Sequence, residues 1–190
     1  TTESNRFSSR SITMRKLIIV QARMGSSRLP GKVLKEVCGK TILEHLVVRL
    51  KRVKQIDKIV VATTIKEQDN QIVDLCIKIN TPFYRGSEDD VLSRYYEAAL
   101  KDRADLVIRV TSDCPLIDPC IIDSVVSFYI NNQDKVDYVS NCLNRTYPRG
   151  MDVEVFSFSI LKEAYEEATN DNEREHVTPF IISRPSRYRL

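Results

Sequence analysis

The segment Gln21–Lys32 concentrates residue types that bind phosphate groups. Its two glycines, two serines and three cations are Gly25, Gly31, Ser26, Ser27, Arg23, Arg28 and Lys32. Backbone amides freed by glycine, together with fixed cations, suit a triphosphate. The segment is not a Walker A loop, because five residues separate its glycines and Val33 follows the lysine. The alternative interpretation is an ordinary Gly/Pro turn that carries surface charges.

A second segment, Thr111–Pro119, offers a carboxylate for a metal ion. Asp113 follows a predicted strand, and one carboxylate at such a place could hold Mg²⁺ that bridges protein and phosphate. The alternative is that Asp113 only caps the turn before Pro115. Asp118 is better explained as a helix cap, because Pro119 follows it at the first helical position.

The acidic turn Gly86–Asp90 joins a predicted strand to a predicted helix. Ser87 or Asp90 could accept a hydrogen bond from an exocyclic amine such as N4 of cytosine, so Gly86, Ser87 and Asp90 are candidate nucleotide contacts. The alternative is structural, since the spacing of Ser87 and Asp90 is that of a capping box.

Two further acidic segments follow later in the chain. Gly150–Val155 alternates acidic and apolar residues, which predicts Asp152 and Glu154 on one face of a strand. Two carboxylates there could complete a metal site, and the alternative is the solvent face of an edge strand. His176 follows Glu175, and a lone histidine of this kind is more often structural than catalytic.

Apolar periodicity predicts the elements that must position these residues. Leu17–Val20 is wholly apolar, as expected of a central parallel strand. Strands are predicted at Leu17–Val20, Lys58–Thr63, Thr81–Tyr84, Asp105–Thr111, Val136–Ser140 and Met151–Phe156, and helices at Thr41–Lys54, Ile72–Ile79, Val91–Lys101 and from Pro119 onwards. This alternation predicts a three-layer α/β fold with a mostly parallel sheet and ligands at the carboxyl ends of its strands. The less regular segment Asn141–Arg149 could hold an inserted antiparallel piece.

Length and composition indicate one folded domain, with 190 residues of which 42% are hydrophobic and 29% charged. Residues 1–13 are interpreted as a tag or disordered leader, which leaves a single domain over residues 14–190. No apolar run approaches the roughly 18 residues of a membrane span, and no signal peptide is recognisable, so we expect a cytoplasmic location. The five cysteines form no C-x-x-C pair, which favours reduced thiols.

Positive charge is concentrated early in the chain. Residues 14–54 contain eleven Lys or Arg against two acids, whereas residues 55–190 contain sixteen against twenty-three. A basic segment suits a polyphosphate or a nucleic acid. Against nucleic acid, no Phe or Tyr lies between Arg15 and Val61 to stack on bases. A non-catalytic nucleic-acid-binding protein is nevertheless one open alternative.

The string QARMGSSRLPGKVL, residues 21–34, closely resembles the opening signature of sugar-activating cytidylyltransferases. The type is that of the spore coat polysaccharide biosynthesis protein F, with acylneuraminate and 3-deoxy-manno-octulosonate cytidylyltransferases as wider relatives. Later blocks are similar as well, namely Gly86–Leu92, Ser112–Ile117, Gly150–Phe156 and Arg174–Pro179. Family chains usually continue beyond the point at which this one stops.

The resemblance implies a nucleotide-diphosphosugar-transferase (Rossmann-like) fold in which a sugar hydroxyl attacks the α-phosphate of CTP and releases pyrophosphate. It assigns the triphosphate to Arg23, Arg28 and Lys32, with Arg23 and Lys32 neutralising the leaving group. It also makes Asp113 the Mg²⁺ ligand and Asp152 a second ligand. The remaining candidates are Ala22, Gly25 and Ser26 for the nucleotide, and Asn141, Glu154 and His176 for the sugar.

The leading hypothesis is a Mg²⁺-dependent cytidylyltransferase that makes a CMP-sugar for a surface polysaccharide. Its partners would be CTP and a sugar, with no nucleic acid and no membrane, and the resemblance also admits a homodimer. The alternative enzyme is a glycosyltransferase of similar fold that uses a nucleotide sugar as donor. Such enzymes typically carry a D-x-D metal motif, and the sequence Asp113-Cys114-Pro115 lacks the second acid.

Overall fold

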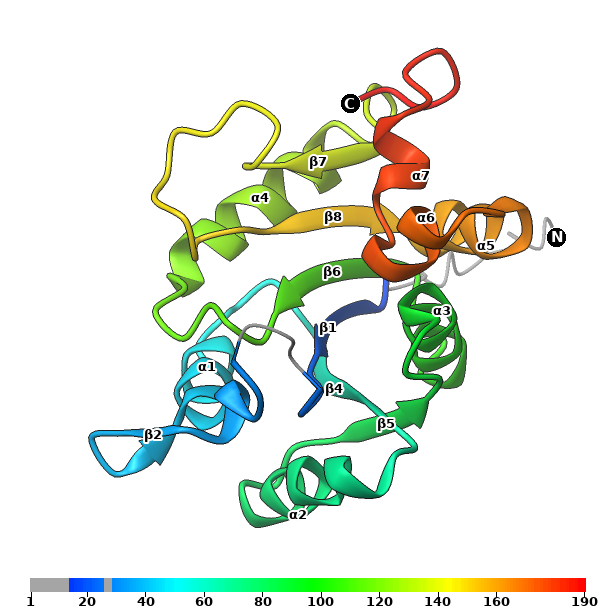
Figure 1. Ribbon diagram of the computed structural model, residues 1–190. Coiled ribbons are helices and arrows are strands. Elements are labelled where there is room, and N and C mark those ends of the chain that lie inside the picture. The colour runs from blue at the N-terminus through cyan, green and yellow to red at the C-terminus, as the bar shows by residue number, and fades with distance from the viewer. Residues whose placement is uncertain (1–13, 26–28) are drawn as a thin grey trace, which may run out of the picture.

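The computed structural model describes residues 14–25 and 29–190, so the predicted leader at 1–13 and the predicted contacts Ser26 and Arg28 lie outside the described residues. Within them, six strands form one sheet in the order β5-β4-β1-β6-β8-β7 (Figure 1). The strands are β1 Lys16–Gln21, β4 Lys58–Thr64, β5 Phe83–Gly86, β6 Leu106–Thr111, β7 Tyr138–Ser140 and β8 Glu154–Ser157. Strand β8 is antiparallel to both of its neighbours and the other pairings are parallel, which confirms a mostly parallel sheet.

Strand β1 lies in the middle of the sheet, between β4 and β6. Residues Leu17–Val20 are fully buried, because both faces of this strand are covered. Ile18 and Val20 pack into one core, and Leu17 and Ile19 into the other. The polar residue Gln21 follows at the carboxyl end, where the strand leaves the core.

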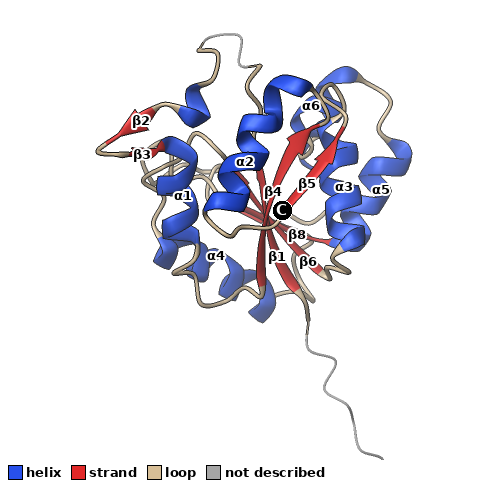
Figure 2. Ribbon diagram, turned by 90° about the horizontal axis from the view of Figure 1, so that it is seen from below, coloured by secondary structure: helices blue, strands red, loops and turns tan. Residues whose placement is uncertain are grey.

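Helices cover both faces of the sheet, which confirms the expected three layers (Figures 1 and 2). Helices α1 (Ile42–Leu50), α2 (Asn70–Lys78) and α4 (Pro119–Asn131) pack on one face. Helices α3 (Val91–Lys101), α5 (Phe158–Glu167) and α7 (Pro179–Ile182) pack on the other, and α6 (Asp171–His176) lies against α3.

Helix starts follow the capping chemistry of the sequence, with one correction. Asp118 accepts a hydrogen bond from the Cys120 amide at 2.8 Å and caps α4, as predicted. The cap of α3 is Asp90 rather than Ser87, because Asp90 Oδ1 accepts from the Ser93 amide at 2.9 Å. Ser87 Oγ instead accepts from the Asp90 amide and shapes the preceding turn.

The largest difference from the sequence prediction lies between β7 and β8. The predicted strand at 151–156 begins only at Glu154, and it pairs with β6 and β7 on its two sides, so it is not an edge strand. Asp152 therefore precedes the strand, so the prediction that Asp152 and Glu154 share one face of a strand is wrong. Glu154 is buried, so the alternative of a solvent face is wrong for it as well. No strand forms within Asn141–Arg149, a described segment of turns, so the antiparallel piece expected there is formed by β8 instead.

A short hairpin that the apolar pattern did not predict follows the first loop. Strands β2 (Glu36–Val37) and β3 (Lys40–Thr41) pair antiparallel before α1, at the left of Figure 1. Gly39, with φ +74°, supplies the left-handed conformation of the turn. Helix α1 starts after this hairpin and ends at Leu50 rather than Lys54. None of the helices in residues 14–25 and 29–190 is long and apolar enough to cross a membrane.

Candidate active site

A pocket of about 340 Å³ lies at the carboxyl ends of β1 and β6, where ligands bind in parallel α/β sheets. Its walls come from the residues after β1, from α3 and α6, and from the segment after β6. Its charged and titratable lining residues are Arg23, Lys32, Arg94, Arg109, Asp113, Glu175 and His176. Four cations therefore converge on one pocket from separate parts of the chain.

The segment after β1 is anchored on both sides of its turn. The Met24 amide donates to Asp69 Oδ1 at 2.7 Å, and the Gly31 amide donates to the Met24 carbonyl at 2.9 Å. Asp69 is fully buried and also accepts a hydrogen bond from the hydroxyl of Thr64 at the end of β4. Gly31 has φ +67°, a conformation that favours glycine. These contacts fix both ends of the segment beside the pocket.

The turn after β5 closes against this segment. A Cβ at Gly25 would lie 2.8 Å from Glu88 Oε1, so a side chain there would require the Glu88 carboxylate to move. Arg23 joins its own segment to the turn after β5 and to α6, because its Nη1 donates to the Glu88 carbonyl at 3.4 Å and its Nη2 lies 3.7 Å from Glu175 Oε1. Ala22 and Arg23 line the pocket, as their assignment to the nucleotide requires.

Lys32 and Asp113 meet at the pocket, as the sequence blocks imply. Lys32 Nζ lies 2.8 Å from Asp113 Oδ2, and both side chains remain partly exposed. Partial burial opposes the charge on Asp113, but hydrogen bonds from Lys32 and Thr111 outweigh it and hold the pKa of this carboxyl below its usual value. Asp113 therefore presents a carboxylate to the pocket at neutral pH.

The chemistry of this donor set fits Mg²⁺ bound to a nucleotide. Mg²⁺ is commonly held by one or two carboxylates together with substrate phosphates. The described residues contain no cluster of three His, Cys, Asp or Glu side chains that would hold a metal by itself. Asp113 is the residue of the pocket that would hold the ion, and this assignment stays a prediction.

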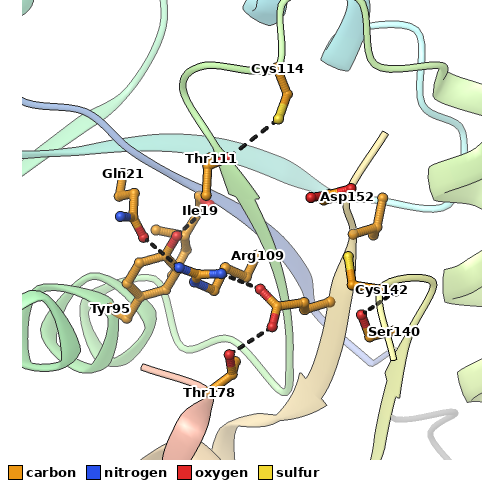
Figure 3. Close-up of polar contacts among 12 residues, drawn as sticks. Ile19, Gln21, Tyr95, Arg109, Thr111, Cys114, Ser140, Cys142, Asp152 and Thr178 are labelled. Atoms are coloured by element: carbon orange, nitrogen blue, oxygen red, sulfur yellow. Dashed lines mark hydrogen bonds and ion pairs between the residues drawn. The ribbon is translucent and has the colours of Figure 1, made fainter. Parts of the chain in front are cut away.

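Asp152 has a different environment from Asp113. Its two oxygens accept hydrogen bonds from Arg145 at 2.6 and 3.1 Å, and these hold the pKa of Asp152 below its usual value. Asp152 is not among the residues that line the pocket. Figure 3 shows it beside Cys142, on the loop that joins β7 to β8. Its assignment as a second metal ligand stays a prediction.

The candidate base contacts in Gly86–Asp90 already have structural roles. Asp90 Oδ1 caps α3, and its Oδ2 lies 3.3 Å from Arg174 Nη1. None of Gly86, Ser87 and Asp90 lines the pocket, although Val91 and Arg94 directly after them do. Their contact with a nucleobase stays a prediction.

A buried polar network extends from the pocket into the sheet (Figure 3). Arg109 on β6 donates to Glu154 on β8 and, at 3.2 Å, to Gln21 Oε1 at the end of β1. Glu154 also accepts from the hydroxyls of Tyr138 at 2.6 Å and Thr178 at 2.7 Å. Burial opposes the charge on Arg109, but the Glu154 carboxylate outweighs it and raises the pKa of the guanidinium. Glu154 thus orients the pocket residue Arg109 through an ion pair. A direct contact of Glu154 with the sugar stays a prediction.

The other two candidate sugar contacts lie apart. His176, at the end of α6, is exposed and lines the pocket. Asn141 closes the base of the β7–β8 loop, because its side chain donates to the Met151 carbonyl at 2.7 Å and accepts from the Val153 amide at 2.9 Å. The structure therefore brings His176 to the pocket and gives Asn141 a place in the adjoining loop.

Sequence reasoning missed Arg94 and Arg109 as pocket residues. Each carried a readable signal. Arg109 interrupts an otherwise apolar run on β6, which marks a buried charge that needs a partner. Arg94 lies three residues after Val91 and four before Ala98, on the face of α3 that packs inward.

The comparison with known families decides the classification. A family model described as cytidylyltransferase matches residues 17–190. The chain belongs to the cytidylyltransferase family. The pocket described above is accordingly the candidate active site of an enzyme that transfers a cytidylyl group.

Individual relatives agree with this family membership. The spore coat polysaccharide biosynthesis protein SpsF of Bacillus subtilis is 35% identical over 92% of this chain and 72% of its own length. A 3-deoxy-manno-octulosonate cytidylyltransferase of Chlamydia trachomatis is 30% identical over 74% of this chain and 55% of its own. A solved cytidylyltransferase of Leptospira borgpetersenii superposes with a TM-score of 0.89 at 37% identity, over 93% of this chain and 74% of the other.

Proposed function

We propose that this cytidylyltransferase couples CTP to a sugar hydroxyl, giving a CMP-sugar and pyrophosphate for the synthesis of a surface polysaccharide. The observation that carries the proposal is the convergence of Arg23, Lys32 and Asp113 on one pocket. A triphosphate brings several negative charges, which these two cations and a metal ion on Asp113 would neutralise. The names of the Bacillus and Chlamydia relatives, a polysaccharide biosynthesis protein and a sugar-acid cytidylyltransferase, support a sugar as the acceptor.

The proposed reaction balances as a single displacement at phosphorus. The sugar hydroxyl oxygen bonds to the α-phosphorus of CTP, the bond from that phosphorus to the bridging oxygen breaks, and pyrophosphate leaves. The hydroxyl proton is released to water. Such transfers depend mainly on positioning and charge neutralisation. Arg23 and Lys32 would bind the departing phosphates. Mg²⁺ held by Asp113 would supply further neutralisation of phosphate charge.

The test is pyrophosphate release across a matrix of four nucleoside triphosphates and a panel of sugars, with Mg²⁺ and with EDTA. We expect release only when CTP, a sugar and Mg²⁺ are all present. Sugar-dependent release from UTP or ATP at the rate seen with CTP would contradict the assignment of the base. Absence of sugar-dependent release with every triphosphate would contradict the proposed reaction.

Replacing Lys32 or Arg23 by alanine is expected to weaken CTP binding by about tenfold to a hundredfold while changing cytidine binding little. The reason is that each loss removes a charge-assisted hydrogen bond of about 1.5–3 kcal/mol to the phosphates only. Calorimetric titration of CTP, CMP and cytidine measures this. Lys35→Ala, at an exposed position three residues from Lys32, is the matched control. Equal weakening for all three ligands would contradict the phosphate assignment.

A further inference from the structure

Arg94 is an unusual arginine, because it is fully buried and yet lines the active-site pocket. Its exposed fraction is 1%, and it leads the fully buried side chains in volume. Neither its Nε nor its Nη1 has a hydrogen-bond partner among the residues that the structure describes. A guanidinium presents its donors along two edges, and Nε and Nη1 belong to different edges. Each edge of the guanidinium therefore carries a buried donor without a partner among the described residues, in a side chain that lines the pocket.

Packing alone does not explain an arginine at this position. Arg94 lies on the inward face of α3, where Val91 and Ala98 are buried apolar residues. An unbranched apolar side chain would fill this space without the penalty of burying unpaired donors. Burial, reinforced by nearby Arg23, lowers the pKa of Arg94. The guanidinium thus lies where a ligand with acceptor atoms would satisfy it.

The charges around Arg94 favour an uncharged ligand group. Asp69 and Glu88 act on Arg94 as negative neighbours, and Arg23 acts as a positive one. Charged groups of both signs therefore already act on Arg94. A phosphate bound directly to Arg94 would add negative charge close to Asp69 and Glu88, whereas a carbonyl oxygen and a ring nitrogen would add none.

The position of Arg94 relative to the turn after β5 agrees with this. A Cβ at Gly86 would lie 2.8 Å from Arg94 Cγ, so the absence of a side chain at Gly86 leaves room for the arginine. Lys32, which follows β1, and Asp113, which follows β6, form an ion pair that does not include Arg94. The pocket therefore has a cation–carboxylate pair for phosphate and metal that is distinct from Arg94.

We propose that Arg94 binds the cytosine base of CTP, donating hydrogen bonds from its guanidinium to O2 and N3 of the ring. This inference rests on the proposed function. O2 and N3 of cytosine are adjacent acceptors, and a guanidinium edge matches such a pair as it does in the recognition of guanine. Uracil carries a hydrogen on N3, so its donor would face the donor of Arg94 in a buried site. Arg94 thus selects cytosine over uracil.

The experiment measures binding of cytidine, CMP, UMP and pyrophosphate to Arg94→Met and Arg94→Lys by calorimetry. We expect cytidine and CMP to bind about tenfold to a hundredfold more weakly, and pyrophosphate to bind within about twofold of wild type. The preference for CMP over UMP should fall toward one. Arg52→Met, at an exposed position after α1, is the matched control and should leave every affinity unchanged.

A second variant keeps the test decisive if the Arg94 variants do not fold. Gly86→Ala retains the arginine but forces it to move, because the new Cβ would meet its Cγ. We expect this variant to lose cytidine affinity and base preference as well. Folding of each variant is checked by thermal unfolding.

The outcomes separate this inference from the proposed function. A variant that keeps the wild-type preference for CMP over UMP overturns the role of Arg94. So does a variant that loses pyrophosphate affinity and keeps cytidine affinity, since Arg94 would then bind phosphate. Sugar-dependent pyrophosphate release by the wild-type protein is measured on the same preparation. Its absence overturns the proposed function, whatever the binding measurements give.

Discussion

Asp113→Ala is expected to reduce cytidylyl transfer by about a thousandfold or more while the fold stays intact. Metal-assisted neutralisation of phosphate charge is worth several kcal/mol, and about 1.4 kcal/mol corresponds to a factor of ten in rate. Asp113 presents its carboxylate to the pocket. Its side chain is 49% exposed, so its removal leaves no cavity in the core. The measurement is the rate of sugar-dependent pyrophosphate release at saturating CTP and Mg²⁺.

The stability of Asp113→Ala should differ little from that of the wild type. Its pair with Lys32 is partly exposed, and exposed pairs contribute at most about 1 kcal/mol. Asp118→Ala is the matched control on the same segment. It removes the cap of α4, which costs about 1 kcal/mol of stability, and should leave the rate near that of the wild type.

Retention of most activity by Asp113→Ala in Mg²⁺ would mean that Asp113 only shapes the turn after β6. A second observation would point the same way, namely a Mg²⁺ dependence of the rate that is unchanged in Asp113→Asn. Asparagine keeps the shape and one acceptor oxygen but lacks the charge, so the metal-ligand role predicts a much higher Mg²⁺ requirement.

Local signals in the sequence predicted the first two-thirds of the fold well. The apolar run Leu17–Val20 identified the central strand, because only a strand covered on both faces tolerates four consecutive apolar residues before a glycine-rich loop. The Asp118-Pro119 pair located the start of α4. One topological rule placed both the loop after β1 and the residue Asp113 at the pocket. The rule is that the carboxyl ends of parallel strands meet at one edge of the sheet.

The last third was predicted less well, because its structure depends on contacts between distant residues. Strand β8 inserts between β6 and β7, and its direction follows from pairing with both. The alternation of acidic and apolar residues before Val155 resembles an edge strand, yet Glu154 is buried because Arg109 supplies its counter-charge. No local pattern contains that partner, which lies 45 residues away.

The same limitation applies to the active site. The sequence identified pocket residues that stand in glycine-rich or acidic turns, such as Arg23 and Asp113. Arg94 and Arg109 lie inside a helix and a strand, where polar residues are ordinarily assigned to the solvent face. The spacing of these two arginines hints at burial, and the structure turns that hint into evidence, because an unpaired or ion-paired arginine is informative when water cannot reach it.

Glu154→Ala is expected to lower the free energy of unfolding by about 3–5 kcal/mol. Removing one partner of a buried ion pair leaves the other charge uncompensated, and Arg109 would remain in the sheet without its carboxylate. The hydroxyls of Tyr138 and Thr178 would lose their acceptor as well. For a domain of this size the loss corresponds to a fall in Tm of roughly 6–20 °C. Chemical and thermal unfolding both measure it.

Two controls assign the effect to the buried charge. Asp152→Ala breaks an exposed pair with Arg145 nearby and should cost at most about 1 kcal/mol. The double variant Arg109→Met with Glu154→Leu removes both charges, so it should be more stable than Glu154→Ala alone, because an apolar pair leaves no buried charge behind. The account would be contradicted if the double variant lost as much free energy of unfolding as Arg109→Met and Glu154→Leu lose together when each is made alone. In that case Arg109 and Glu154 would stabilise the sheet through separate contacts rather than through their charge pair.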